Sequence, residues 1–98
     1  MAFEVLFEPD AIEHLQSLSA RDRTTVLDAV RKQLTHMPTR ETRNRKQLQP
    51  NPLARWELRV GSFRVFYDCI ELQQRVRVLA IGHKEHQRLL IAGKEYEL

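Results

Sequence analysis

Residues 56–67 read Trp-Glu-Leu-Arg-Val-Gly-Ser-Phe-Arg-Val-Phe-Tyr, and this stretch decides the fold. Two runs of alternating polarity flank Gly61-Ser62, and such a two-residue Gly-X pair is typical of a type II′ hairpin turn. A turn there places Arg59 directly opposite Arg64. Because successive side chains on a strand point to opposite faces, the hairpin has an apolar and a polar face. The apolar face holds Trp56, Leu58, Val60, Phe63, Val65 and Tyr67, and the other holds Glu57, Arg59, Arg64 and Phe66.

The opposed arginines indicate an anion site. Like charges that face each other across two strands destabilise a sheet, so a bound anion would offset their repulsion. The alternative is that both guanidinium groups are solvated and that Glu57 partly neutralises Arg59. For an opposed pair in a chain with a net charge of +3, we favour the anion site.

Length and composition indicate one soluble globular domain that spans residues 1–98, with 42% hydrophobic and 30% charged residues. No apolar run reaches the length that crosses a membrane, and no signal peptide precedes Phe3. The single cysteine, Cys69, cannot form an internal disulfide, which suits a reducing cytoplasm. No spacing of Cys and His residues resembles a metal site. We therefore expect a cytoplasmic protein with no membrane segment, metal or cofactor.

The N-terminal part of the chain predicts one strand followed by two helices. Residues 2–8 are typical of a strand, and Pro9 suits the first turn of a short helix. Ser19 is typical of the N-cap of a second helix, and Pro38 ends this helical run. The apolar face of the second helix holds Val26, Leu27, Val30, Leu34 and Met37. Helices joined by so short a connection are expected to form an antiparallel pair.

The loop at 38–53 is basic and long for a small domain. Prolines at positions 38, 50 and 52, with polar residues between them, indicate irregular structure. Its basic residues before the second proline are Arg40, Arg43, Arg45 and Lys46. With Arg55, Arg59 and Arg64 they lie within residues 40–64, a range that contains only two acidic residues. Such a cluster indicates a nucleic acid or an acidic partner, and a solvated linker is the alternative.

The C-terminal half predicts the rest of the sheet. The second hairpin strand runs on to about Glu71, a turn follows at 72–74, and the β-rich run 76–81 is typical of an interior strand. The tail at 85–98 is expected to form a short helix at 85–90 and an extended end at 96–98. The predicted fold class is α+β, with the helix pair on one face of an antiparallel sheet of about four strands in the order β-α-α-β-β-β. The other face is expected to be open and to carry the two arginines.

Through Lys84, the sequence resembles the RelE/ParE superfamily of toxins from type II toxin-antitoxin systems. The most specific parts are Phe-Arg-Val-Phe-Tyr at 63–67 and Gly-His-Lys at 82–84. The resemblance implies one fold with two activities, because RelE-like members cut mRNA in the ribosomal A site whereas ParE-like members inhibit DNA gyrase. It also implies a small antitoxin that neutralises the toxin. Operator DNA is then expected to be bound only through the toxin-antitoxin complex.

The resemblance also implies catalytic roles for four basic residues. Arg64 matches the arginine that recurs in the family strand, and Arg59 lies where RelE-like toxins place a basic residue. His83 and Lys84 match a Gly-His-Arg/Lys pattern that is common across the superfamily. There are two departures: Glu57 lies where a RelE-type lysine is expected, and no tyrosine follows the last strand closely. These departures favour the gyrase inhibitor, or a degenerate toxin retained for antitoxin binding.

Metal-independent RNA cleavage needs a base for the 2′-hydroxyl, cations for the phosphate and an acid for the leaving oxygen. Arg59 and Arg64 suit the phosphate because guanidinium groups bind it bidentately. His83 is a candidate base or acid because histidine titrates near neutral pH, and it could instead simply end a strand. On the arginine face Glu57 is the alternative base, and a lysine, Lys84 or Lys46, is the candidate acid.

The predicted RNA-binding residues are Arg43, Arg45, Lys46 and Phe66. Phe66 could stack on a base, as aromatic side chains do in single-stranded RNA sites, or it could pack under the C-terminal tail. The sequence thus predicts a toxin that cleaves ribosome-bound mRNA without a metal, with inhibition of DNA gyrase as the alternative.

Overall fold

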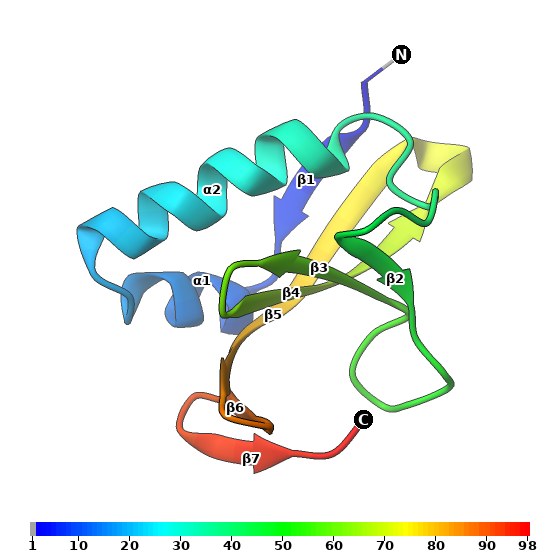
Figure 1. The fold of residues 1–98 in the computed structure, drawn as a ribbon. Helices are drawn as coiled ribbons and strands as arrows, with labels where there is room; N and C mark the ends of the chain where they lie inside the picture. Colours follow the sequence, from blue (N-terminus) through cyan, green and yellow to red (C-terminus); the bar gives the residue numbers. More distant parts are fainter. Residues whose placement is uncertain (1) are drawn as a thin grey trace.

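The computed structural model describes residues 2–98, and within them two helices lie on one side of a seven-stranded sheet (Figure 1). The elements in chain order are β1 (Glu4–Phe7), α1 (Pro9–Gln16), α2 (Ala20–Leu34), β2 (Arg45–Gln47), β3 (Trp56–Val60), β4 (Phe63–Ile70), the 3₁₀ turn η1 (Glu71–Gln73), β5 (Arg75–Glu85), β6 (Arg88–Ile91) and β7 (Lys94–Tyr96). The predicted α+β class is therefore confirmed, and β1, α1, α2, β3, β4 and β5 follow the predicted order β-α-α-β-β-β. The sheet has seven strands and not about four, because β2 forms within the loop predicted at 38–53 and β6 and β7 form in the tail. None of the helices in residues 2–98 is long and apolar enough to cross a membrane.

The β3–β4 hairpin has the predicted register. Arg59 pairs with Arg64 and Trp56 pairs with Tyr67, on either side of a turn in which Gly61 has a φ of +58°. That backbone conformation is one that glycine adopts without strain, which is why this turn follows from the sequence. The rings of Trp56 and Tyr67 stack with centroids 6.2 Å apart inside the core.

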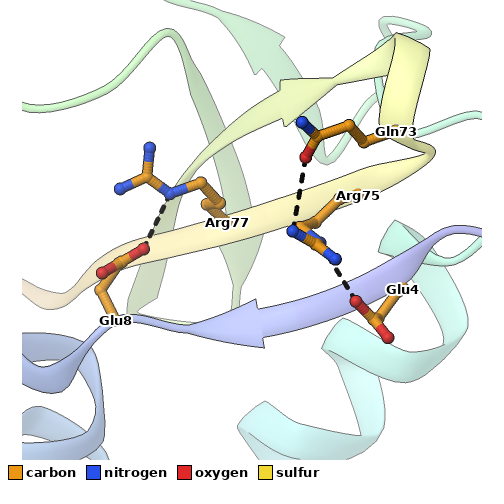
Figure 2. A network of polar contacts seen from close by, with 5 residues as sticks. All are labelled: Glu4, Glu8, Gln73, Arg75 and Arg77. Carbon is orange, nitrogen blue, oxygen red and sulfur yellow. Dashed lines mark hydrogen bonds and ion pairs between the residues drawn. The ribbon is translucent and has the colours of Figure 1, made fainter.

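The central strand is β5, which has partners on both edges. β4 runs antiparallel along one edge, while β1 and β6 occupy successive parts of the other edge. β1 lies parallel to β5, so the expectation of a purely antiparallel sheet fails for this strand. Two ion pairs join β1 to β5 (Figure 2), Arg75 with Glu4 at 3.1 Å and Arg77 with Glu8 at 2.7 Å. Because these side chains are partly exposed, the pairs add little stability and chiefly support the register.

A histidine from α1 closes the gap between β1 and β6 along the edge of β5. β1 pairs with β5 as far as Val78, and β6 begins to pair at His83. Between them the Ile81 N–H lacks a strand partner and donates instead to His14 Nδ1, at 3.1 Å. A buried backbone donor without an acceptor is costly, so His14 ties α1 to the sheet at a point where the β ladder is interrupted.

The tail is a β-hairpin, so the predicted helix at 85–90 is wrong. β5 continues to Glu85, and β6 and β7 follow as two further antiparallel strands. Each turn contains a residue other than glycine with positive φ, His86 at 59° in the first and Ala92 at 53° in the second, and the second also contains Gly93 at 79°. The usual hairpin signal is glycine or asparagine at such positions. The first turn has neither residue, so the sequence did not reveal it, whereas Gly93 was an available signal for the second turn.

Side chains pack on both faces of the sheet. The face opposite the helices was expected to be open, but it is partly covered. The main core lies between the helices and the sheet, and its fully buried members include Val26, Leu34, Leu58, Val65, Tyr67, Val76 and Val78. A second, smaller cluster on the opposite face consists of Ala54, Phe66, Ala80, Leu89 and Ile91. The terminal hairpin therefore covers part of the sheet and leaves the arginine end uncovered.

We predict that His14→Leu lowers the free energy of unfolding by about 1–3 kcal/mol, because the buried Ile81 N–H loses its acceptor. Chemical denaturation of the purified chain measures the change. The matched control is His36→Leu, which alters an exposed histidine just beyond α2 and should stay within about 0.5 kcal/mol of the unmodified chain. Equal stability of the two variants would contradict the role given to His14.

Candidate functional site

On the face away from the helices, side chains from neighbouring strands form three rows, because directly paired residues point to the same face. The first row is Lys46, Glu57, Phe66 and Ala80. The second is Arg59, Arg64 and Gly82. The third is Lys84, Leu89 and Tyr96. The register alone thus brings three of the four predicted catalytic residues and the predicted RNA-binding Lys46 onto one face.

These rows line a pocket of about 670 Å³ between the segment after β2 and the terminal hairpin. Its cationic residues are Lys46, Arg59, Arg64 and Lys84, and its acidic residues are Glu57 and Glu97. The other lining residues are Gln47, Leu48, Gln49, Gln87, Leu89, Tyr96 and Leu98. Four cations against two carboxylates give the lining of this pocket an excess of positive charge, which attracts anions.

Arg64 is the most recessed cation of the pocket, with 9% of its surface exposed. Its Nη1 donates to the carbonyl oxygens of Gly61 and Phe63, each at 2.8 Å, which fixes the guanidinium beside the hairpin turn. Burial lowers the pKa of Arg64, Glu57 raises it and the opposed Arg59 lowers it. Within residues 2–98 no carboxylate forms an ion pair with this guanidinium. An anion in the pocket would stabilise the charged form of Arg64 and so offset the cost of its burial and of its repulsion by Arg59.

Two of the predicted RNA-binding residues are buried, and both contact other parts of the protein. Phe66 is fully buried in the second cluster under the terminal hairpin, so it has no surface on which a base could stack. Arg45 is 9% exposed, and its guanidinium donates to backbone carbonyls of the helix end and of the following loop. The other two differ from these, because Lys46 lines the pocket and Arg43 is exposed just before β2.

His83 lies on the other face of the sheet, away from the cationic pocket. It pairs with Phe63 across the strands, its ring centroid is 5.2 Å from that of Phe63, and its Nε2 is 3.0 Å from Ser62 Oγ. It lines a separate pocket of about 630 Å³ beside α1. Adjacent residues of a strand must point in opposite directions, so His83 and Lys84 cannot share a site. The sequence already contained this information, since the alternation that placed Arg64 also separates these two residues.

Gly82 has a packing role that the sequence analysis did not assign to it, although it belongs to the Gly-His-Lys motif at 82–84. A Cβ atom there would lie 2.9 Å from Leu89 Cδ1, 3.0 Å from Ile91 Cγ1 and 3.1 Å from the Leu90 carbonyl oxygen, so the absence of a side chain at Gly82 lets β6 lie this close to β5 without a shift. That fold brings Leu89 and Tyr96 to the wall of the cationic pocket. The only available signal was the glycine within a strand, which indicates a close approach of another segment.

Chemically, the pocket can hold a phosphate and move protons. Arg59 and Arg64 are adjacent guanidinium groups, which suit a phosphate oxygen pair. Glu57 is a carboxylate next to them in the neighbouring row, and Lys46 and Lys84 are primary amines. Residues 2–98 contain no cluster of three or more His, Cys, Asp or Glu side chains that could hold a metal ion.

We predict that Gly82→Ala loosens the terminal hairpin and costs about 1–3 kcal/mol of stability, because the added methyl group displaces Leu89 and Ile91. Amide hydrogen exchange should speed up in β6 and β7 and stay slow in β3 and β4. Arg21→Ala, on the exposed side of α2, is the control and should leave exchange in β6 unchanged. Unaltered protection of β6 in Gly82→Ala would contradict the close approach described above.

Comparisons with known proteins agree with this arrangement. The profile of a family described as "ParE toxin of type II toxin-antitoxin system, parDE" matches residues 5–88. A search of curated proteins gave no match. Among solved structures, the chain is similar to one from the toxin-antitoxin complex RelBE2 of Mycobacterium tuberculosis, with a TM-score of 0.73, 23% identity, and coverage of 85% of this chain and 99% of that chain.

A second solved structure with the same fold is the archaeal RelE–RelB complex from Pyrococcus horikoshii OT3. The TM-score is 0.69 and the identity is 22%, with coverage of 88% of this chain and 99% of that chain. At such identities the likeness establishes the arrangement of helices and strands, and the chemistry of the pocket has to be argued from the residues of this chain.

Proposed function

This chain belongs to the ParE toxin family of type II toxin-antitoxin systems, and we propose that it is a metal-independent endoribonuclease that cleaves mRNA at the ribosome. The observation that carries the proposal is that Arg59, Arg64, Lys84 and Lys46 line one pocket together with the half-buried carboxylate Glu57. Clustered guanidinium groups bind phosphate, and a carboxylate beside them can accept a proton.

In the proposed reaction, Arg64 and Arg59 bind the non-bridging oxygens of the scissile phosphate and stabilise the charge that develops there. Glu57 takes the proton of the 2′-hydroxyl, and the 2′-oxygen attacks phosphorus. Lys84 or Lys46 donates a proton to the 5′-oxygen as the P–O bond to it breaks. The products are a 2′,3′-cyclic phosphate and a free 5′-hydroxyl, so charge and protons balance without a metal. His83 has no part in this scheme, because it faces the other side of the sheet.

Inhibition of DNA gyrase is the second candidate. The matching family is described as the ParE toxin of parDE, and this description favours the activity of ParE-like toxins. The pocket also has no histidine among its lining residues, and a carboxylate lies where a RelE-type lysine is expected. In this alternative the cationic pocket would bind an acidic surface of a protein and would catalyse no reaction.

We predict that Arg64→Ala abolishes growth inhibition, because removing one interaction with the transition state costs about 10²–10³ in rate. The purified chain and its variants are compared in two assays, cell-free translation with mapping of mRNA cleavage, and supercoiling by gyrase. Arg59→Ala removes an exposed guanidinium from the same pocket without disturbing the core. It should therefore lose activity in whichever of the two assays Arg64→Ala does. Arg21→Ala, on the exposed side of α2, is the control.

The two assays separate the candidates. Cleavage of ribosome-bound mRNA that both pocket variants lose supports the endoribonuclease. Inhibition of supercoiling with intact translation supports the gyrase inhibitor. A folded Arg64→Ala variant with full toxicity would show that the pocket is not the site of either activity.

We further predict a stable complex with a small antitoxin, since the two similar structures are toxin-antitoxin complexes. An acidic antitoxin segment would neutralise the cationic pocket, and operator DNA would be bound by the complex of the two chains. Co-expression with the product of the adjacent reading frame, followed by size-exclusion chromatography, tests this. The expected result is co-elution together with relief of growth inhibition. Separate elution at micromolar concentrations would contradict the prediction.

A further inference from the structure

The segment 38–44, between α2 and β2, is an ordered part of the basic loop. Its backbone turns back at Arg40, whose N–H donates to the Met37 carbonyl at 3.1 Å. The Thr42 hydroxyl accepts from the backbone N–H groups of Asn44 and Arg45, at 3.3 and 3.2 Å. Asn44 then accepts at its carbonyl from the Arg59 N–H, at 2.7 Å. This last hydrogen bond joins the segment to the strand that carries Arg59 into the cationic pocket.

The buried side chain of Arg45 holds the segment 38–44 from beneath. Its Nε donates to the Arg40 carbonyl at 3.1 Å, and its Nη1 donates to the carbonyls of Gln33 and His36 at the end of α2. One guanidinium therefore connects the last turn of the helix with the loop that follows. The Tyr67 hydroxyl makes a second anchor at Pro38, donating to its carbonyl at 2.8 Å.

Two exposed arginines depend on this support. Arg40 and Arg43 are the cations of the segment, and both side chains are exposed. A mobile loop would have to be ordered on binding, at a cost in backbone and side-chain entropy. A segment whose backbone is already fixed avoids most of that cost, so its arginines bind phosphates more tightly.

We propose that Arg45 is a positioning residue, which fixes the segment 38–44 so that Arg40 and Arg43 extend the phosphate-binding surface from the pocket along single-stranded RNA. The proposal rests on the proposed endoribonuclease function. In this proposal Arg45 does not contact RNA itself, and it acts by holding Arg40 and Arg43 in place. The guanidinium of Arg45 is turned toward backbone carbonyls, and the cations that touch RNA are its neighbours.

Lysine cannot take over this role although it keeps the charge. The acceptors of Arg45 belong to three residues, Gln33, His36 and Arg40, and the planar guanidinium reaches them with donors in fixed directions. A lysine ammonium is a single point charge at the end of a flexible chain. Arg45→Lys therefore preserves net charge while it releases the segment 38–44.

The test is a double-mutant cycle on RNA affinity. Binding of a labelled single-stranded RNA oligonucleotide is measured across a salt series for Arg45→Lys, for the double variant Arg40→Gln/Arg43→Gln, and for the triple variant. Arg45→Lys should weaken binding several-fold and flatten the dependence of log K on log salt by about 0.7 for each phosphate that the chain no longer neutralises. In the background of the double variant, Arg45→Lys should have no further effect, because the arginines it positions are already gone.

Arg23→Lys is the matched control. The Arg23 guanidinium also donates to three backbone carbonyls, those of Leu15, Gln16 and Leu18, at the corner between α1 and α2. Arg23→Lys should lower the free energy of unfolding, measured by chemical denaturation, about as much as Arg45→Lys does. It should leave the affinity for the RNA oligonucleotide and the salt dependence of that affinity unchanged. An effect of Arg45→Lys that exceeds the control is then an effect on RNA binding and not on folding.

The outcomes are distinct. A several-fold loss in Arg45→Lys that vanishes in the triple variant supports the inference. A loss that persists in full in the triple variant would mean that Arg45 acts independently of Arg40 and Arg43, and unchanged affinity would mean that it positions nothing; either result overturns the inference alone. If the unmodified chain binds no RNA, the proposed function itself fails, and the inference fails with it.

Discussion

The pairing of β5 on both of its edges is the constraint on which the rest of the structure depends. β4 holds one edge, and β1 and β6 share the other, so β5 cannot rotate about its axis. Each side chain in the middle of the sheet thereby points either to the helices or to the opposite face, which carries the second hydrophobic cluster and the cationic pocket. Neighbours in sequence such as His83 and Lys84 serve different surfaces for this reason. The chemistry of the site follows from the register before any side-chain contact is considered.

The positive charges gathered in the pocket destabilise the sheet, because like charges on paired residues repel each other. Arg64 is nearly buried, it faces Arg59 across the hairpin, and the carboxylate in the next row is Glu57. Desolvation lowers the pKa of Arg64, which means that the folded state bears a cost to keep this cation charged. An anion in the pocket would offset that cost. A local arrangement that opposes stability in this manner is typical of a binding surface.

Most of the fold could be predicted from the sequence, because its elements carry ordinary signals. Gly61-Ser62 indicated the hairpin and its register, and Ser19 caps α2 by accepting from the Asp22 N–H at 3.1 Å as expected. The terminal hairpin was missed because the turn that leads into it places His86 in a backbone conformation that usually calls for glycine or asparagine, and the single glycine of the next turn, Gly93, was a weak signal without it. The alternation of the hairpin predicted that Arg59 and Arg64 share a face, and the register confirms that placement. The alternative that Phe66 packs under the C-terminal tail is also confirmed, although the tail is a hairpin and not the expected helix.

The separate roles of Arg45 and Lys46 come from a strand of only three residues. β2 pairs Arg45 with Leu58, which belongs to the main core, and Lys46 with Glu57, which lines the pocket. A shift of the register by one residue would exchange the two side chains and send Lys46 beneath the loop. A lysine there could not bridge the helix end and the segment 38–44, and an arginine in the pocket would leave those carbonyls without donors. The register of this three-residue edge strand therefore determines that Arg45 supports the loop and that Lys46 faces the pocket. An alternation of only three residues within a basic loop is too short to be recognised from the sequence.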